Sequence, residues 1–188
     1  MNEGVFQRED PTAGREEVYH LADALVALGE GRAAVDLMRR EVNVARSSFP
    51  AASVKLLRLL SQYAEILEST DALAEAEFIR AEALENVVTA SITTQDAIDA
   101  FLKYGLLLCK MHNYDGAIAR LKEAVRRTEA LEDIGTLHRQ IILAQAWRSQ
   151  AQAFEALGEF SEASNALDVL MNVKRHIRFI VFSPSHGR

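Results

Sequence analysis

The chain contains few of the residues that interrupt regular structure. Its 188 residues include only 9 Gly and 3 Pro, whereas 49% are hydrophobic and 26% are charged. Glycine and proline are the strongest markers of turns and loops, so their scarcity favours long, uninterrupted secondary-structure elements. A chain of this length and composition can also bury a substantial core. We therefore predict a single all-helical unit.

Cysteine and long apolar runs are also scarce, and negative charges outnumber positive ones. Cys109 is the lone cysteine, so no disulfide can form within the chain and nothing calls for an oxidising compartment. The net charge of −6 argues against general affinity for nucleic acid or anionic membranes, which attract positive surfaces. No apolar run of about 18 residues occurs, and the start lacks the apolar core of a signal peptide. We expect a cytoplasmic protein that binds neither nucleic acid nor membranes.

Motifs that carry catalysis or metal binding are missing as well. None of the five histidines pairs with cysteine or another histidine at a metal-ligand spacing. No glycine-rich phosphate loop or nucleophile motif occurs. Cys109 falls inside an expected helix, where packing is the simpler interpretation than reactivity. The sequence thus predicts no metal, no cofactor and no enzymatic activity.

A repeat is what the chain does contain. A small residue follows an aromatic or aliphatic one at a fixed offset in the pairs Leu73/Ala76, Tyr114/Ala117 and Phe160/Ala163, and a weaker copy ends at Ala34. The alanines at 34, 76, 117 and 163 are 42, 41 and 46 residues apart. A period of this size predicts an array of helical hairpins.

Breaks in the helical pattern divide the array into four hairpins. The expected repeats cover residues 15–49, 50–91, 94–133 and 136–176, and residues 1–13 form a flexible lead-in. Turns are expected at Gly29, at Ser69 to Asp71, at His112 and at Gly158. Pro50 should sit in the first turn of the third helix, where its missing N–H costs nothing.

These features resemble the tetratricopeptide repeat family over residues 16–176. The copies are longer than the familiar repeat of about 34 residues and look like the long form found in kinesin light chains and many bacterial regulators. The resemblance implies a right-handed α-α superhelix of about four hairpins. It also implies close helix approach at the small residues Ala22, Ala64, Gly105 and Ala151. The fourth copy shows the pattern most fully, as Trp147, Gln150, Ala151, Phe154, Gly158, Phe160, Ala163 and Leu167.

The same resemblance implies a concave groove, lined mainly by the first helix of each hairpin, that binds a protein or peptide partner. The lining is acidic toward the N-terminal end and basic toward the other, so a peptide of mixed charge could be oriented by it. The transferred positions are Tyr19, His20, Asp23, Arg58, Gln62, Glu65, Asp99, Leu102, Lys103, Leu106, Lys110, Arg148 and Gln152. A protein-interaction scaffold or adaptor is the expected function. The alternative is a regulatory sensor that binds a small molecule or signalling peptide in the groove.

The last twelve residues form an apolar tail, 177–188, in place of the polar capping helix that usually ends such an array. Two interpretations stay open. The tail either folds back over the final hairpin or is exposed and pairs with a second copy or another protein. The residues that would carry self-association are Ile177, Phe179, Ile180 and Phe182.

Overall fold

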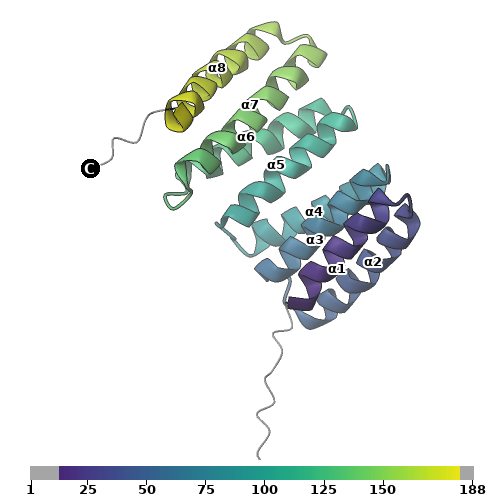
Figure 1. Ribbon diagram of the computed structural model, residues 1–188. Helices are drawn as coiled ribbons and strands as arrows, with labels where there is room; N and C mark the ends of the chain where they lie inside the picture. Colours follow the sequence, from purple (N-terminus) through teal and green to yellow (C-terminus); the bar gives the residue numbers. More distant parts are fainter. Residues whose placement is uncertain (1–12, 183–188) are drawn as a thin grey trace, which may run out of the picture. The chain divides into compact units, whose positions relative to one another are not determined.

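The computed structural model describes residues 13–182 and the side chains of residues 17–180. Eight helices and no strand occur within that range, so the predicted all-α class is confirmed (Figure 1). Residues 1–12 of the expected lead-in and residues 183–188 of the expected tail lie outside it. The helices are α1 (Ala13–Ala27), α2 (Gly31–Ser48), α3 (Val54–Ser69), α4 (Leu73–Thr89), α5 (Gln95–Lys110), α6 (Tyr114–Ala130), α7 (Thr136–Leu157) and α8 (Phe160–Phe182).

The described residues divide into two compact units, residues 13–76 and 77–182, and the boundary between them falls within α4. In the first unit α1 packs against α2, α2 packs against α3, and α1 also contacts α3. In the second unit α5 pairs with α6 and α7 pairs with α8, while α7 also contacts α5 and α6. Each unit therefore repeats one arrangement, in which the first helix of a hairpin lies beside the first helix of the next.

The predicted small positions all lie in the core. The alanines at 22, 34, 64, 76, 117, 151 and 163 are each at most 3% exposed, and Gly105 is buried. A β-carbon added at Gly105 would lie only 2.7 Å from Leu121 Cγ of α6. At Gly105 the two helices of the hairpin approach so closely that Leu121 occupies the space a side chain would need.

The turns inside the four hairpins share one hydrogen-bonded geometry. Gly29, Asp71, His112 and Gly158 all adopt positive φ, between 60° and 81°. At each of these turns, two backbone N–H groups donate to carbonyls of the last helical turn, as in His112 N to Cys109 O and Asn113 N to Leu108 O. This is the Schellman pattern of helix ends. The repeat seen in the alanines is thus also present in the turns.

Two expected boundaries are wrong. Pro50 lies before α3 rather than in its first turn, because Ser53 is extended (φ −77°, ψ 125°) and α3 begins at Val54. The helical structure also does not end at residue 176, since α8 continues to Phe182. Ile177 and Ile180 continue the three- and four-residue spacing of the buried residues Leu170 and Val173. That spacing keeps them on the inner face of the same helix.

Candidate partner-binding faces

In the first unit, the expected binding residues lie on α1 and α3. Tyr19, His20 and Asp23 are on α1, and Arg58, Gln62 and Glu65 are on α3. All six side chains are at least partly exposed. The Tyr19 hydroxyl donates a hydrogen bond to Glu65 Oε2 over 3.0 Å, which joins two residues 46 positions apart. The His20 ring lies beside the Tyr19 ring, with 5.7 Å between centroids.

The environment of Tyr19 keeps its hydroxyl protonated. Burial raises the pKa of Tyr19 to about 12, and the nearby carboxylates of Glu65 and Asp23 add to the rise. A phenol with this pKa stays a hydrogen-bond donor at neutral pH. The face of α1 and α3 therefore presents a hydrogen-bonded tyrosine–carboxylate pair close to the carboxylate of Asp23.

In the second unit, the expected residues lie on α5 and α7. Asp99, Lys103, Leu106 and Lys110 are on α5, and Arg148 and Gln152 are on α7, all at least partly exposed. Leu102 is the exception, because it is only 4% exposed and packs in the core together with Phe101. Our placement of Leu102 on the binding surface is wrong. The remaining set carries more positive than negative charge, unlike the face of the first unit.

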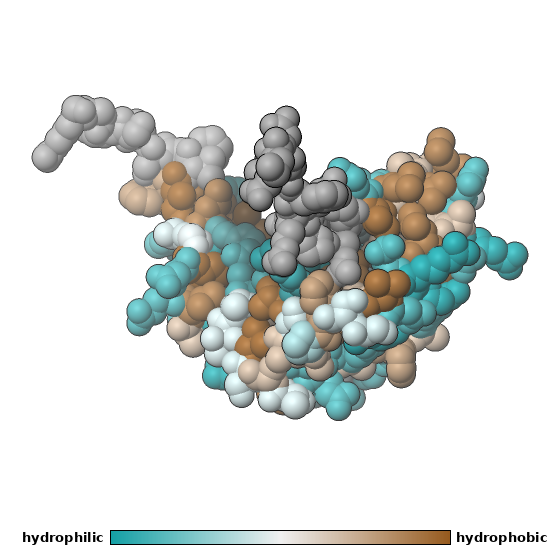
Figure 2. Space-filling model, turned by 90° about the horizontal axis from the view of Figure 1, so that it is seen from below, coloured by the Kyte–Doolittle hydropathy of each residue, from teal (hydrophilic) through white to brown (hydrophobic). Residues whose placement is uncertain are grey.

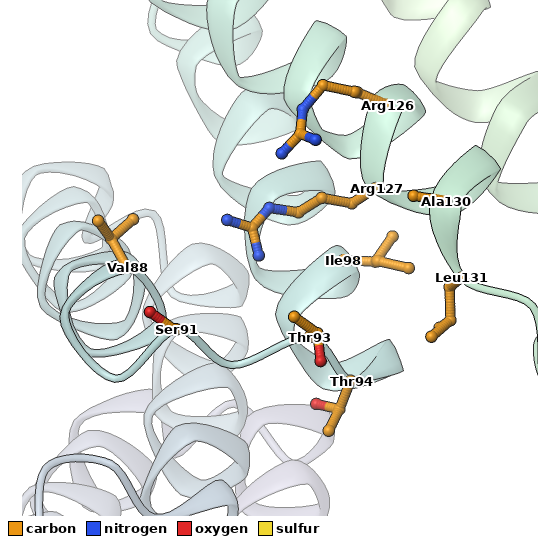
Figure 3. Close-up of a pocket in the computed structure, with 9 residues that line it drawn as sticks. All are labelled: Val88, Ser91, Thr93, Thr94, Ile98, Arg126, Arg127, Ala130 and Leu131. Carbon is orange, nitrogen blue, oxygen red and sulfur yellow. The ribbon is translucent and has the colours of Figure 1, made fainter.

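The structure also contains a cavity that the sequence analysis missed. It has a volume of about 300 Å³ and lies between the end of α4, the α4–α5 connection, the start of α5 and the end of α6 (Figure 3). Figure 3 shows Arg126 and Arg127 extending from α6 toward the end of α4. The lining is completed by Val88, Ser91, Thr93, Thr94, Ile98, Ala130 and Leu131.

Arg127 connects the parts of the chain that surround this cavity. Its Nη1 donates to the Ile92 carbonyl at 3.0 Å, its Nε donates to Glu123 Oε1 at 2.7 Å, and its guanidinium lies 4.5 Å from the Phe101 ring centroid. Arg126 donates to the same Glu123 carboxylate. Hydrogen bonds from Arg126 first, and then from Arg127, lower the pKa of Glu123 to about 2. Glu123 therefore stays ionised and offsets part of the positive charge at the cavity.

The structure describes the side chains of three of the four residues expected to carry self-association, and these differ in exposure. Ile177 and Ile180 are half-buried, whereas Phe179 is 71% exposed. The Phe182 side chain lies outside the described residues. Because α8 continues through this segment, residues expected to lie together are distributed around a helix. Figure 2 shows apolar side chains (brown) exposed among hydrophilic ones (teal) on the face seen from below.

The lone cysteine behaves as a packing residue. Cys109 is half-buried against a cluster formed by Ile118, Ala153, Phe154 and Ala163. Burial raises the pKa of its thiol, which disfavours the reactive thiolate.

No group of three or more potential metal ligands occurs in the part of the chain that the structure describes. Among residues 13–182, none of the helices has both the length and the apolarity needed to cross a bilayer.

Solved structures share this architecture. BtubC (BKLC) from P. vanneervenii is 17% identical and superimposes with a TM-score of 0.76 over 98% of this chain and 71% of its own. A kinesin light chain from Podospora anserina with nearly identical TPR-like repeats is 12% identical, with a TM-score of 0.60 over 93% of this chain and 100% of its own. This chain has a tetratricopeptide-like repeat fold. No protein-family model and no curated protein matches its sequence.

Two further solved structures share this tetratricopeptide-like fold. Aspartyl phosphate phosphatase F from Bacillus subtilis is 15% identical, with a TM-score of 0.70 over 94% of this chain and 47% of its own. A Rap protein solved in complex with competence and sporulation factor is 16% identical, with a TM-score of 0.55 over 85% of this chain and 52% of its own. The chain spans about half the length of each. At these identities the likeness concerns the fold.

Proposed function

We propose that this tetratricopeptide-like chain is a protein-interaction module, a scaffold or adaptor whose first helices contact an extended or helical segment of a partner protein. The observation that carries the proposal is the arrangement of α1 beside α3 in one unit and of α5 beside α7 in the other. Both pairs present exposed polar side chains, and the Tyr19–Glu65 hydrogen bond holds one such pair in place.

The charges of the two faces suggest how a partner is selected. Asp23 and Glu65 make the first face acidic, while Lys103, Lys110 and Arg148 make the second basic. Complementary charge mainly sets the specificity and the association rate of a complex. We therefore expect a partner segment of mixed charge. Apolar contact would come from Tyr19 and Leu106, both partly exposed, and no longer from the buried Leu102.

Charge reversal on the second face tests the proposal. The double variant Lys103→Glu/Arg148→Glu and the unchanged chain are each used to capture proteins from the source cell, and captured proteins are quantified by mass spectrometry. The matched control is Arg120→Glu/Lys122→Glu, which makes the same charge change on the second helix α6. We expect a stoichiometric partner that the control retains and the first variant loses. Equal capture by all three proteins would contradict binding at these faces.

A regulatory sensor is the second candidate, and the cavity of Figure 3 favours it. Its volume of about 300 Å³ is at the lower end of the range for small-molecule sites. Three hydroxyl side chains, those of Ser91, Thr93 and Thr94, line it together with the two arginines of α6. The Rap neighbour was solved in complex with competence and sporulation factor, so this fold binds another molecule in at least one other protein.

Mass spectrometry of the purified chain distinguishes the two candidates. A sensor should release a stoichiometric metabolite or short peptide when the chain is denatured. Replacement of a small lining residue by a large one, Ala130→Trp, would fill the cavity and should abolish that retention. An adaptor should release nothing and should keep its captured protein in the Ala130→Trp variant.

A further inference from the structure

An exposed apolar stripe runs along α8, the last helix of the second unit. Phe160 is 72% exposed, Leu167 is 40% exposed and Met171 is 56% exposed. Their spacings of seven and four residues place them on one face of the helix. The buried residues of α8, among them Ala163, Ala166 and Leu170, lie on a different side and pack toward α7.

The repeat shows what normally covers such a stripe. Ala163 of α8 corresponds to Ala117 of α6, so Phe160, Leu167 and Met171 correspond to Tyr114, Leu121 and Val125. The exposed fraction is 0% for Leu121 and 7% for Val125, and Tyr114 packs against a cluster that includes Ala153 and Phe154 of α7.

The next helix, α7, thus helps to cover this face of α6. In α8 the equivalent positions remain apolar, yet within residues 13–182 no further helix follows to cover them. The stripe therefore consists of apolar residues like those of a helix–helix contact, yet its side chains are exposed.

The charges along α8 indicate which helix could cover the stripe. Asp168 lies beside the stripe near the middle of α8, and the basic residues Lys174, Arg175 and Arg178 lie on or beside it in the second half of the helix. All four side chains are exposed. A second α8 laid antiparallel would bring Asp168 toward the basic half of its partner, whereas a parallel one would place Asp168 opposite Asp168 and the basic residues opposite one another.

We propose that a second copy of this chain covers the stripe, through antiparallel packing of α8 against α8 about a two-fold axis. Leu167 of each copy then packs against Met171 of the other, near the axis. Asp168 lies near Arg175 of the second copy, and Phe160 lies near the Arg178 guanidinium of the second copy, which suits a cation–π contact. Such an interface is self-complementary and closes as a dimer.

Sedimentation equilibrium of the full chain tests this assembly. We expect a dimer for the unchanged protein and at least about a tenfold weaker association for Met171→Glu, because it places a charge in the apolar centre. The matched control is Val169→Glu, the same kind of change on the opposite side of α8, where 37% of the side chain is exposed. It should leave association unchanged, and circular dichroism confirms that both variants remain folded.

Charge exchange then tests the antiparallel orientation. Asp168→Arg should weaken the dimer, and Asp168→Arg/Arg175→Asp should restore it, since both copies then carry the pair with reversed sign. An unchanged protein that stays monomeric at high micromolar concentration would overturn the proposal. A dimer that Met171→Glu leaves intact, or whose strength the double exchange does not recover, would also overturn it.

Discussion

Gly105 of α5 and Leu121 of α6 lie in direct contact, so that a β-carbon at position 105 would come within 2.7 Å of Leu121 Cγ and 2.8 Å of its Cδ2. Leu121 is fully buried. The backbone carbonyl of Ala117 would also lie 3.3 Å from that β-carbon. The close approach of the two helices therefore requires glycine, which has no side chain, at position 105.

Gly105→Ala should therefore lower the free energy of unfolding by about 1–3 kcal/mol, the usual cost of overpacking a core. Urea titration followed by circular dichroism measures the change. Gly135→Ala is the matched control, because no atom lies within 4 Å of the added β-carbon and φ is −56°. A stability for Gly105→Ala equal to that of the control would show that the two helices can separate without cost.

Gly158→Ala isolates the backbone contribution of a hairpin turn. Its φ is 78°, and no atom lies within 4 Å of an added β-carbon, so only the left-handed conformation opposes the substitution. We expect a loss of about 1 kcal/mol in the free energy of unfolding. Gly135→Ala again serves for comparison, since it has the same open surroundings with a negative φ. Equal stabilities of the two variants would mean that the turn relaxes to another geometry.

Gln150 is a buried polar residue whose replacement should stabilise the protein. It is 0% exposed, and both its Nε2 and its Oε1 lie in the core without a hydrogen-bond partner. Leaving buried polar atoms unpaired costs about 1–3 kcal/mol, which an apolar side chain of similar size avoids. Gln150→Met should therefore raise the midpoint of thermal unfolding, as measured by calorimetry. A lowered midpoint would mean that an ordered water molecule or a small movement satisfies the amide.

The ionised Glu123 carboxylate stabilises the folded protein in a way that depends on pH. Its pKa in the folded protein, about 2, lies below that of an unfolded glutamate. Its contribution to the free energy of unfolding is therefore complete above the unfolded pKa and declines as the pH falls toward 2. Glu123→Gln should therefore destabilise the protein at neutral pH, and its deficit should shrink at pH values of about 3. Denaturant titrations at both pH values measure the deficit, with Glu129→Gln on the same helix as the control. A deficit independent of pH would contradict an ionic role.

Particular residues show how far sequence reasoning reached. The alanines at 34, 76, 117 and 163 predicted the hairpins, because a small residue that recurs at a fixed period has few explanations other than close helix contact. The spacing of Leu170, Val173, Ile177 and Ile180 also indicates that α8 continues past residue 176, although the apolar composition of the segment alone does not. Leu102 could not be assigned in this way, because both it and Phe101 are apolar and only packing shows that both are buried.

The cavity beside α6 could not be predicted from the sequence. It depends on Arg127 reaching the Ile92 carbonyl, 35 residues away, and nothing in the local pattern of either segment indicates that contact. The Tyr19–Glu65 bond is similar, since both residues were expected on one face but their pairing requires α1 and α3 at a definite distance.

The sequence alone determined the helical class, the number of hairpins and the places where helices touch, because period and side-chain size are properties of the chain itself. Only the tertiary structure decided which of the polar and apolar side chains are exposed, which distant residues pair, and that the apolar stripe of α8 is uncovered within residues 13–182. Those properties depend on distances between helices, and such distances arise only when the helices pack.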